Sequence, residues 1–255
     1  MLPHIWIFDT YSIMLLVCVI ACLFVYYKYS KKKGLNEDYI YSILLVACIS
    51  IILGLVFASL FQILFNALKG NKFDGTFPMT FFGGLVGGVA TFILIYVFYI
   101  KRKYKESNFI KDILIIAPGC ITLAHGCGRI GCFLAGCCYG IETTSWLGVT
   151  FPGMTHKVLP TQLFEAAFLF VLSAILIVLA FKKDCIFNMS IYLCAYGVFR
   201  YNIELIRGDD RGAYFLNLSP SQWFSLIAII SSMVLFVLLF KKYYLDVKKE
   251  EKVEE

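Results

Sequence analysis

The sequence predicts an all-α integral membrane protein with about seven transmembrane helices, and three observations support this. Of its 255 residues, 60% are hydrophobic and only 16% are charged, whereas soluble domains carry about a quarter charged residues. The apolar residues form long blocks, and the lysines and arginines gather between alternate blocks. A backbone surrounded by lipid must satisfy its own hydrogen bonds, so we expect helices. The plainest blocks cover residues 11–27, 77–100, 163–181 and 223–240, each near or above the roughly 18–20 residues that cross a bilayer.

Taken in order, the blocks extend to seven predicted spans, and glycine or charge interrupts the fourth and the sixth at one end. The spans lie at about 11–29, 40–67, 79–100, 109–125, 162–181, 189–207 and 221–244. The basic residues near the N-terminus follow the first apolar run rather than precede it, which indicates an uncleaved first span and not a signal peptide. We expect a single polytopic membrane domain over residues 1–245 and a charged cytoplasmic tail over 246–255.

The basic residues predict the orientation. The loops after the first, third and fifth spans and the C-terminal tail hold 16 of the 23 lysines and arginines. Because cytoplasmic loops carry the excess of basic residues, the N-terminus is expected outside and the C-terminus in the cytoplasm. The net charge of +6 then belongs to loops near anionic lipid and does not indicate a nucleic-acid surface.

The ten cysteines fall into two groups. Five lie in or beside apolar spans and are expected to be small buried residues: Cys18, Cys22, Cys48, Cys185 and Cys194. The other five cluster between Cys120 and Cys138, where no CxxC pair or zinc-like spacing occurs. We therefore predict no metal site and no cofactor. The sequence leaves undecided whether two of these five cysteines form a disulfide on the outer side of the membrane.

The stretch HGCGRIGCFLAGCCYG, residues 125–140, combines glycines with one arginine. Small residues recur every fourth position at Gly128, Cys132, Gly136 and Gly140, which is typical of close helix packing. Packing does not explain Arg129, because an arginine in the bilayer centre costs at least about 2.5–3.5 kcal/mol. A re-entrant or broken segment that lines a polar cavity explains both features, since glycine lets backbone N–H groups approach a phosphate. We favour an anion-binding cavity over simple packing.

Two further segments carry polar residues into apolar sequence. In FRYNIELIRGDDRG, Arg200, Glu204 and Arg207 follow one another at helical spacing and share a face. Arg129 and Arg200 are expected to clamp one phosphate, with Glu204 orienting an arginine. In LPTQLFEA, Gln162 and Glu165 stand three apart at a helix start and are predicted to line the cavity or to pair helices.

These segments, together with FFGGLVGG (81–88) and LSPSQWFSL (218–226), occur in the order found in prolipoprotein diacylglyceryl transferases, which the chain resembles over nearly its whole length. The resemblance implies seven spans with the N-terminus outside, in a bacterial plasma membrane. It also implies that a diacylglyceryl group moves from phosphatidylglycerol to the lipobox cysteine thiol of a lipoprotein precursor, with glycerol phosphate leaving.

The resemblance assigns roles residue by residue. Arg129 and Arg200 match the family's phosphate-recognising arginines, and Tyr11, Glu204 and Gly140 match its first-span tyrosine, sixth-span glutamate and final signature glycine. We predict His125, Arg129, Arg200, Glu204 and Tyr11 as catalytic residues. The predicted substrate-binding residues are Arg129, Gly128, Gly131, Cys132, Cys137, Gly140, Gln162, Glu165, Arg207, Gly83 and Gly84.

The sequence departs from the family's pattern at four positions. The third-span histidine of the family is Phe82, two asparagines are Cys132 and Ala135, and a glutamate is Cys137. His125, absent from the usual pattern, is then a candidate base or a structural hydrogen-bonding residue. Two alternatives remain: a transferase with another acceptor that uses Cys137 or Cys138 covalently, and a lipid-binding membrane protein without chemistry.

Overall fold

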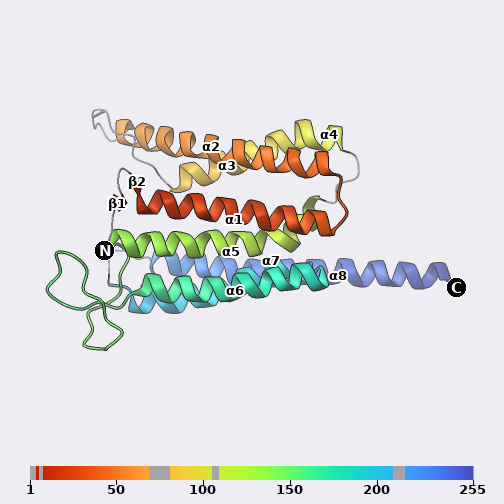
Figure 1. Cartoon of the computed structure of the whole chain (residues 1–255). Coiled ribbons are helices and arrows are strands. Elements are labelled where there is room, and N and C mark those ends of the chain that lie inside the picture. Colours follow the sequence, from red (N-terminus) through yellow and green to blue (C-terminus); the bar gives the residue numbers. More distant parts are fainter. Residues whose placement is uncertain (1–3, 6–7, 69–80, 105–108, 209–215, 255) are drawn as a thin grey trace. The chain divides into compact units, whose positions relative to one another are not determined.

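The structure is a computed structural model that describes residues 4–5, 8–68, 81–104, 109–208 and 216–254. Its residues divide into two compact units, one formed by residues 1–29 and 109–255 and the other by residues 30–108. The helices of the two units are drawn in Figure 1. The predicted single domain over residues 1–245 stays a prediction.

The first unit holds most of α1 and all of the helices that follow residue 108. A two-stranded antiparallel pair, β1 (His4–Ile5) and β2 (Phe8–Asp9), precedes α1 (Thr10–Lys32). The remaining elements are α5 (Phe109–Ala135), α6 (Thr161–Lys183), α7 (Asn188–Ile203), the 3-10 turn η2 (Glu204–Ile206) and α8 (Pro220–Glu254). Helix α5 packs against α6 and α7, and α7 packs against α8 (Figure 1).

The second unit is a helical hairpin. Helix α2 (Glu37–Leu68) packs against α3 (Phe81–Ile95), which continues through the π-helical turn η1 (Tyr96–Ile100) into α4 (Lys101–Lys103). Glycines form this contact, since a Cβ added to Gly54 would lie 3.1 Å from the carbonyl oxygen of Gly84. Small residues let two membrane helices approach closely, and this accounts for the glycines of FFGGLVGG within the unit.

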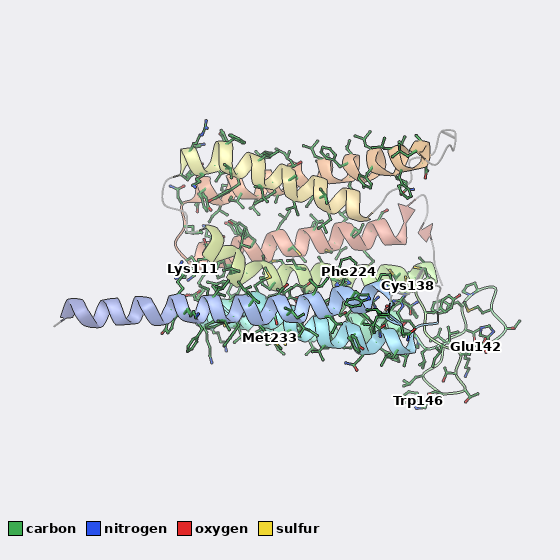
Figure 2. The ribbon with its side chains drawn as sticks, turned by 180° about the vertical axis from the view of Figure 1, so that it is seen from behind. Lys111, Cys138, Glu142, Trp146, Phe224 and Met233 are labelled. Atoms are coloured by element: carbon green, nitrogen blue, oxygen red, sulfur yellow. The ribbon has the colours of Figure 1, made fainter. Side chains whose placement is uncertain are left out.

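The predicted fold class is confirmed: the chain is an all-α integral membrane protein. Six helices of the described part are long and apolar enough to cross a bilayer. The predicted span at 189–207 forms α7 and η2. Helix α7 has 16 residues and is therefore not among these six, which each have at least 18. Lipid-facing side chains are large and apolar, such as Phe224 and Met233 on α8, which Figure 2 labels. The predicted orientation stays a prediction.

One helix boundary differs from the prediction. Helix α5 continues through Ala135, so GRIG lies in regular helix and the irregular backbone expected there begins at Gly136. Close packing explains the extension, because a Cβ on Gly126 would lie 2.8 Å from the Phe170 ring of α6. Helix α8 runs through Glu254 and extends beyond α5, α6 and α7 of its own unit (Figure 1), and the predicted charged cytoplasmic tail over 246–255 stays a prediction.

One amide holds three helices of the first unit together. Asn188 at the start of α7 is fully buried, and its Nδ2 donates to the carbonyl oxygens of Ile115 in α5 and Leu176 in α6, at 2.8 and 2.9 Å. Ile115, which carries one of the two acceptors, belongs to a buried apolar cluster with Ile116 and Ala180.

We expect Asn188→Ala to lower the free energy of unfolding by about 1–3 kcal/mol, because two buried acceptors lose their donor. Thermal unfolding in detergent measures this. Asn202→Ala is the matched control, since the amide of Asn202 is exposed and donates only within its own helix. Equal stability of the two variants would contradict the role given to Asn188.

Candidate functional site

The loop at residues 136–160 joins α5 to α6 beyond the ends of the helices (Figure 1). Backbone hydrogen bonds tie it to the segment after η2: Ile141 N donates to Ile206 O at 2.9 Å, and Gly208 N donates to Tyr139 O at 3.2 Å. Gly140 N donates to Leu159 O at 2.8 Å. The end of α5, the start of α6 and the end of α7 therefore meet at Gly140.

Two arginines and a carboxylate from three helices converge just inside this meeting point. Glu165 in the second turn of α6 is fully buried. Its Oε2 lies 2.9 Å from Nε of Arg129 in α5 and 3.5 Å from Nη1 of Arg200 in α7. A buried charge is stable only when it is paired, and here each partner compensates the others. The sequence pattern predicted all three residues but not that Glu165 would lie between the arginines.

Arg200 is held by two further groups. Its Nη2 lies 2.8 Å from Glu204 Oε2 and donates to Ser221 Oγ at 3.0 Å. Glu204 in turn accepts a hydrogen bond from Ser219 Oγ at 2.8 Å. The expectation that Glu204 orients an arginine agrees with this geometry. Groups on α6, η2 and the start of α8 therefore fix the guanidinium group of Arg200.

Tyr196 completes the cluster and was missed by the sequence analysis. Its hydroxyl donates to Glu165 Oε1 at 2.8 Å and lies 3.5 Å from Nε2 of His125. His125 Nε2 is also 3.7 Å from Glu165 Oε1, and the His125 side chain keeps 29% of its surface exposed. A signal was available, because Tyr196 precedes Arg200 by four residues and so shares its helix face.

The other predicted residues divide by position. Gln162 is fully buried and donates through Nε2 to the carbonyl oxygen of Cys137, so it anchors the loop to α6. Arg207 is buried, and its guanidinium group lies close enough to Cys138 to lower the pKa of that thiol. Gly131 is buried in α5 beside the half-buried Cys132, one turn after Arg129. Cys137 is exposed in the loop.

Three predicted site residues, Tyr11, Gly83 and Gly84, are not placed in the site, and neither is Phe82, one of the departures from the family's pattern. Tyr11 belongs to α1, but its side chain lies outside the described residues. The same holds for Phe82. Gly83 and Gly84 lie in the second unit, where Gly84 faces Ala58 of α2. Their predicted part in substrate binding stays a prediction.

Two glycines of the signature stretch have opposite surroundings, and this gives a prediction. A Cβ on Gly140 would lie 2.7 Å from the Ile206 carbonyl oxygen, whereas a Cβ on Gly128 would meet nothing within 4 Å. We expect Gly140→Ala to cost about 1–3 kcal/mol of stability through overpacking. Gly128→Ala should leave thermal unfolding unchanged and weaken only ligand binding at the open face beside Arg129. Equal destabilisation of both variants would contradict this.

Two cysteines of the loop, Cys137 and Cys138, lie close to Cys132 at the end of α5. Hydrogen bonds from the thiols of Cys132 and Cys137, together with the nearby Arg207 guanidinium, lower the pKa of the Cys138 thiol.

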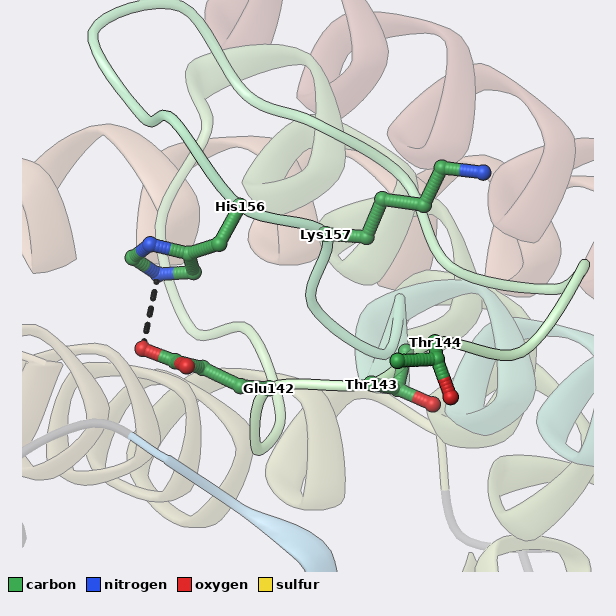
Figure 3. Close-up of a pocket in the computed structure, with 5 residues that line it drawn as sticks. All are labelled: Glu142, Thr143, Thr144, His156 and Lys157. Atoms are coloured by element: carbon green, nitrogen blue, oxygen red, sulfur yellow. Dashed lines mark ion pairs between the residues drawn. The ribbon is translucent and has the colours of Figure 1, made fainter.

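An exposed pocket is lined by residues of the same loop and contains an ion pair 3.2 Å long between His156 and Glu142 (Figure 3). Such a surface pair contributes little to stability. Its remaining lining residues are Thr143, Thr144 and Lys157.

The geometry suits an anionic ligand. Arg129 and Arg200 share Glu165, and Arg200 also pairs with Glu204. The buried Arg207 adds a third guanidinium group nearby, so arginines outnumber carboxylates. Arginine forks match the oxygens of a phosphate, and Gly128 leaves space beside Arg129. The fold and this cluster define a multi-spanning membrane protein with a buried cluster of arginines and carboxylates at one end of its helices.

Comparison with known proteins identifies the family. The family model of prolipoprotein diacylglyceryl transferase matches residues 4–238. The chain is 34% identical to a phosphatidylglycerol–prolipoprotein diacylglyceryl transferase of Clostridium tetani, over 89% of the chain and 91% of that protein. It is 32% identical to a second protein so named, number 2 of Clostridium perfringens, over 89% of each chain. The Clostridioides difficile relative is 29% identical over 94% of each chain.

The chain belongs to the prolipoprotein diacylglyceryl transferase family. The resemblance drawn from the sequence motifs is thus confirmed, and the protein is a transferase of the membrane.

Proposed function

We propose that the protein transfers a diacylglyceryl group from phosphatidylglycerol to the cysteine thiol of a lipoprotein precursor. The observation that carries the proposal is the convergence of Arg129 and Arg200 on one oxygen of Glu165, at 2.9 and 3.5 Å. Two guanidinium groups from different helices that meet at one point mark a position for an anionic oxygen. In a chain of this family, the phosphate of the lipid is the ligand that fits that position.

The two arginines act on the leaving group. The acceptor sulfur forms a bond to the glyceryl carbon, the bond from that carbon to the phosphate oxygen breaks, and its electron pair leaves with glycerol phosphate. Negative charge develops on the phosphate as it departs. Fixed positive groups lower the barrier because they need no reorganisation at that moment. Arg200 meets this condition, since Glu204 and Ser221 hold it in place.

The acceptor thiol must lose its proton to become a nucleophile. His125 is the most accessible proton acceptor beside the arginines, and its Nε2 lies within 3.7 Å of both Tyr196 Oη and Glu165 Oε1. Glu165 would stabilise the imidazolium that forms. We therefore keep His125 as the proposed base, with Tyr196 and Glu165 as the residues that orient it.

A groove suited to acyl chains runs along the helix that carries Arg200. It lies between α7 and α8, and its lining is almost wholly apolar: Ser190, Ile191, Cys194, Ser232, Met233, Phe236 and Val237. Cys194 precedes Arg200 by six residues, which is about 9 Å along a helix. A lipid whose phosphate meets Arg200 would place its acyl chains beside this groove. We propose a bacterial plasma membrane as the location, with the N-terminus and the loop at residues 136–160 outside.

The test is transfer in vitro. Purified full-length protein in detergent receives phosphatidylglycerol labelled in its glyceryl group and a peptide with a lipobox cysteine. We expect a labelled thioether product with the cysteine peptide and none with the matching serine peptide. Arg129→Ala should abolish the product. Arg102→Ala is the control, because Arg102 is an exposed arginine of the second unit whose guanidinium group lies over the ring of Phe98.

A lack of product with folded protein, under conditions where the Clostridium tetani relative is active, would overturn the proposal. Cysteine-dependent transfer to another acceptor would then favour a transferase of different specificity. Saturable phosphatidylglycerol binding without turnover would favour a lipid-binding protein.

A further inference from the structure

The C-terminal cap of α5 brings together three cysteines: Cys132 in the last turn of the helix, and Cys137 and Cys138 in the loop that follows. Gly136 N donates to Phe133 O, and Cys137 N donates to Cys132 O, both at 3.1 Å, with Gly136 in the left-handed region at φ +74°. This is the Schellman arrangement, which sets the residue after the glycine against the third residue from the helix end. Cys137 therefore faces Cys132, and Cys138 follows with φ +65°. All three Sγ atoms lie within 4.8 Å of one another.

The distances fit thiolate ligands of one metal ion. A zinc–sulfur bond of about 2.3 Å in tetrahedral geometry separates sulfur atoms by about 3.8 Å. Small side-chain rotations close the difference from the observed spacing. Soft thiolate ligands select zinc or copper(I) over magnesium or calcium. The sequence spacing predicted no metal site, because the helix cap that joins Cys132 to Cys137 does not appear as a CxxC pair.

The surroundings supply charge compensation and an open position. Three thiolates around a divalent ion leave a net charge of −1, and the buried Arg207 guanidinium group lies near Cys138. Such an outer partner is typical of metal sites. Cys137 is exposed, so the cluster reaches solvent on its other side. Among the described residues, the cluster offers three ligand atoms, the Sγ atoms of the three cysteines. A three-ligand zinc site keeps its fourth position for water or substrate.

We propose that Cys132, Cys137 and Cys138 bind a zinc ion whose fourth position takes the acceptor cysteine as a thiolate. This role rests on the proposed function. Coordination favours the thiolate form of the acceptor, and the thiol proton passes to His125, the proposed base. The sulfur then attacks the glyceryl carbon and the electron pair of the broken C–O bond leaves with the phosphate.

The position of the cysteines supports this role. Cys132 lies one helical turn from Arg129, which places the metal-bound sulfur beside the phosphate position. Cys132 and Cys137 are also two of the four departures from the family's pattern.

The experiment uses the purified, reduced full-length protein in detergent and Co²⁺ as a spectroscopic probe. We expect one Co²⁺ per chain, a thiolate-to-cobalt charge-transfer band, and displacement of the band by Zn²⁺. Cys132→Ser, Cys137→Ser and Cys138→Ser should each weaken binding at least about 10–100-fold, the scale on which site residues change metal affinity. Cys185→Ser, in the loop between α6 and α7, is the control that keeps full binding. Thermal unfolding identifies any variant that fails to fold.

A second arm tests the open position. Adding the lipobox cysteine peptide should increase the charge-transfer absorbance of the cobalt-loaded protein, and the serine peptide should not. Wild-type protein that binds neither Co²⁺ nor Zn²⁺ overturns the inference, whatever its transferase activity. Metal binding with no response to the cysteine peptide overturns the role of the fourth position. Metal binding and peptide ligation without transfer leave the inference standing and overturn the proposed function alone.

Discussion

Glu165→Gln is expected to reduce diacylglyceryl transfer by more than about 100-fold and to lower the free energy of unfolding by about 3–5 kcal/mol. Removal of one partner of a buried ion pair leaves the remaining charge uncompensated, and this is the usual cost. Glu165 is the shared partner of Arg129 and Arg200, and it also accepts the hydroxyl of Tyr196. Glutamine keeps the shape of the side chain, removes its charge and replaces one acceptor oxygen by an NH2 donor. Transfer assays and thermal unfolding in detergent measure the two effects.

Glu142→Gln is the matched control. The Glu142 carboxylate also pairs with a histidine, but it is 73% exposed on the loop shown in Figure 3. Water can solvate both charges there, so we expect changes below about 1 kcal/mol. If Glu165→Gln behaved like this control, the buried cluster would have no part in stability or transfer.

Arg200→Lys is expected to lower the transfer rate by about 100- to 1,000-fold, the scale for loss of one fixed donor in a reaction that develops negative charge. An ammonium group is a compact point charge and cannot span Glu165, Glu204 and Ser221 as the planar fork of Arg200 does. The total charge of the site stays the same, so the variant separates geometry from charge. The rate with saturating lipid, measured beside the KM for phosphatidylglycerol, distinguishes lost catalysis from lost binding.

Arg102→Lys is the control for that substitution, since Arg102 is exposed at the end of α4. Transfer at the wild-type rate by Arg200→Lys would show that positive charge alone suffices. The position of Arg200 between two carboxylates would then have no catalytic meaning.

The sequence was enough to predict the class of fold, because membrane spans depend on the length and polarity of local segments. It was also enough to single out Arg129, Glu165, Arg200 and Glu204, since a charge inside an apolar block is rare and expensive. The helix boundaries were predicted less well at the glycines. Gly126 and Gly128 looked like the start of irregular backbone, yet Gly126 is needed for contact with α6 and α5 continues past both.

The pairing of the charged residues was not predictable, because it depends on how three helices pack. Sequence spacing places Arg200 and Glu204 on one face, but it does not say that Glu165 of another helix lies beside them. Tyr196 was overlooked because a tyrosine in an apolar helix is ordinary, and only the neighbouring carboxylate gives it a role. The three-cysteine cluster depends on a turn with two left-handed residues, one of which is a cysteine, and residue type alone does not indicate that.

The position of Glu165 between two arginines has a consequence for turnover. Before a lipid arrives, the guanidinium groups already have a resident counter-ion, the carboxylate that belongs to the protein itself. A phosphate therefore enters by ion exchange, and its net affinity is the difference between two ion pairs rather than the full strength of one. After the reaction, the carboxylate returns to the arginines as glycerol phosphate leaves. Rapid release of glycerol phosphate and modest affinity for the lipid then have the same cause, which is competition from the Glu165 carboxylate.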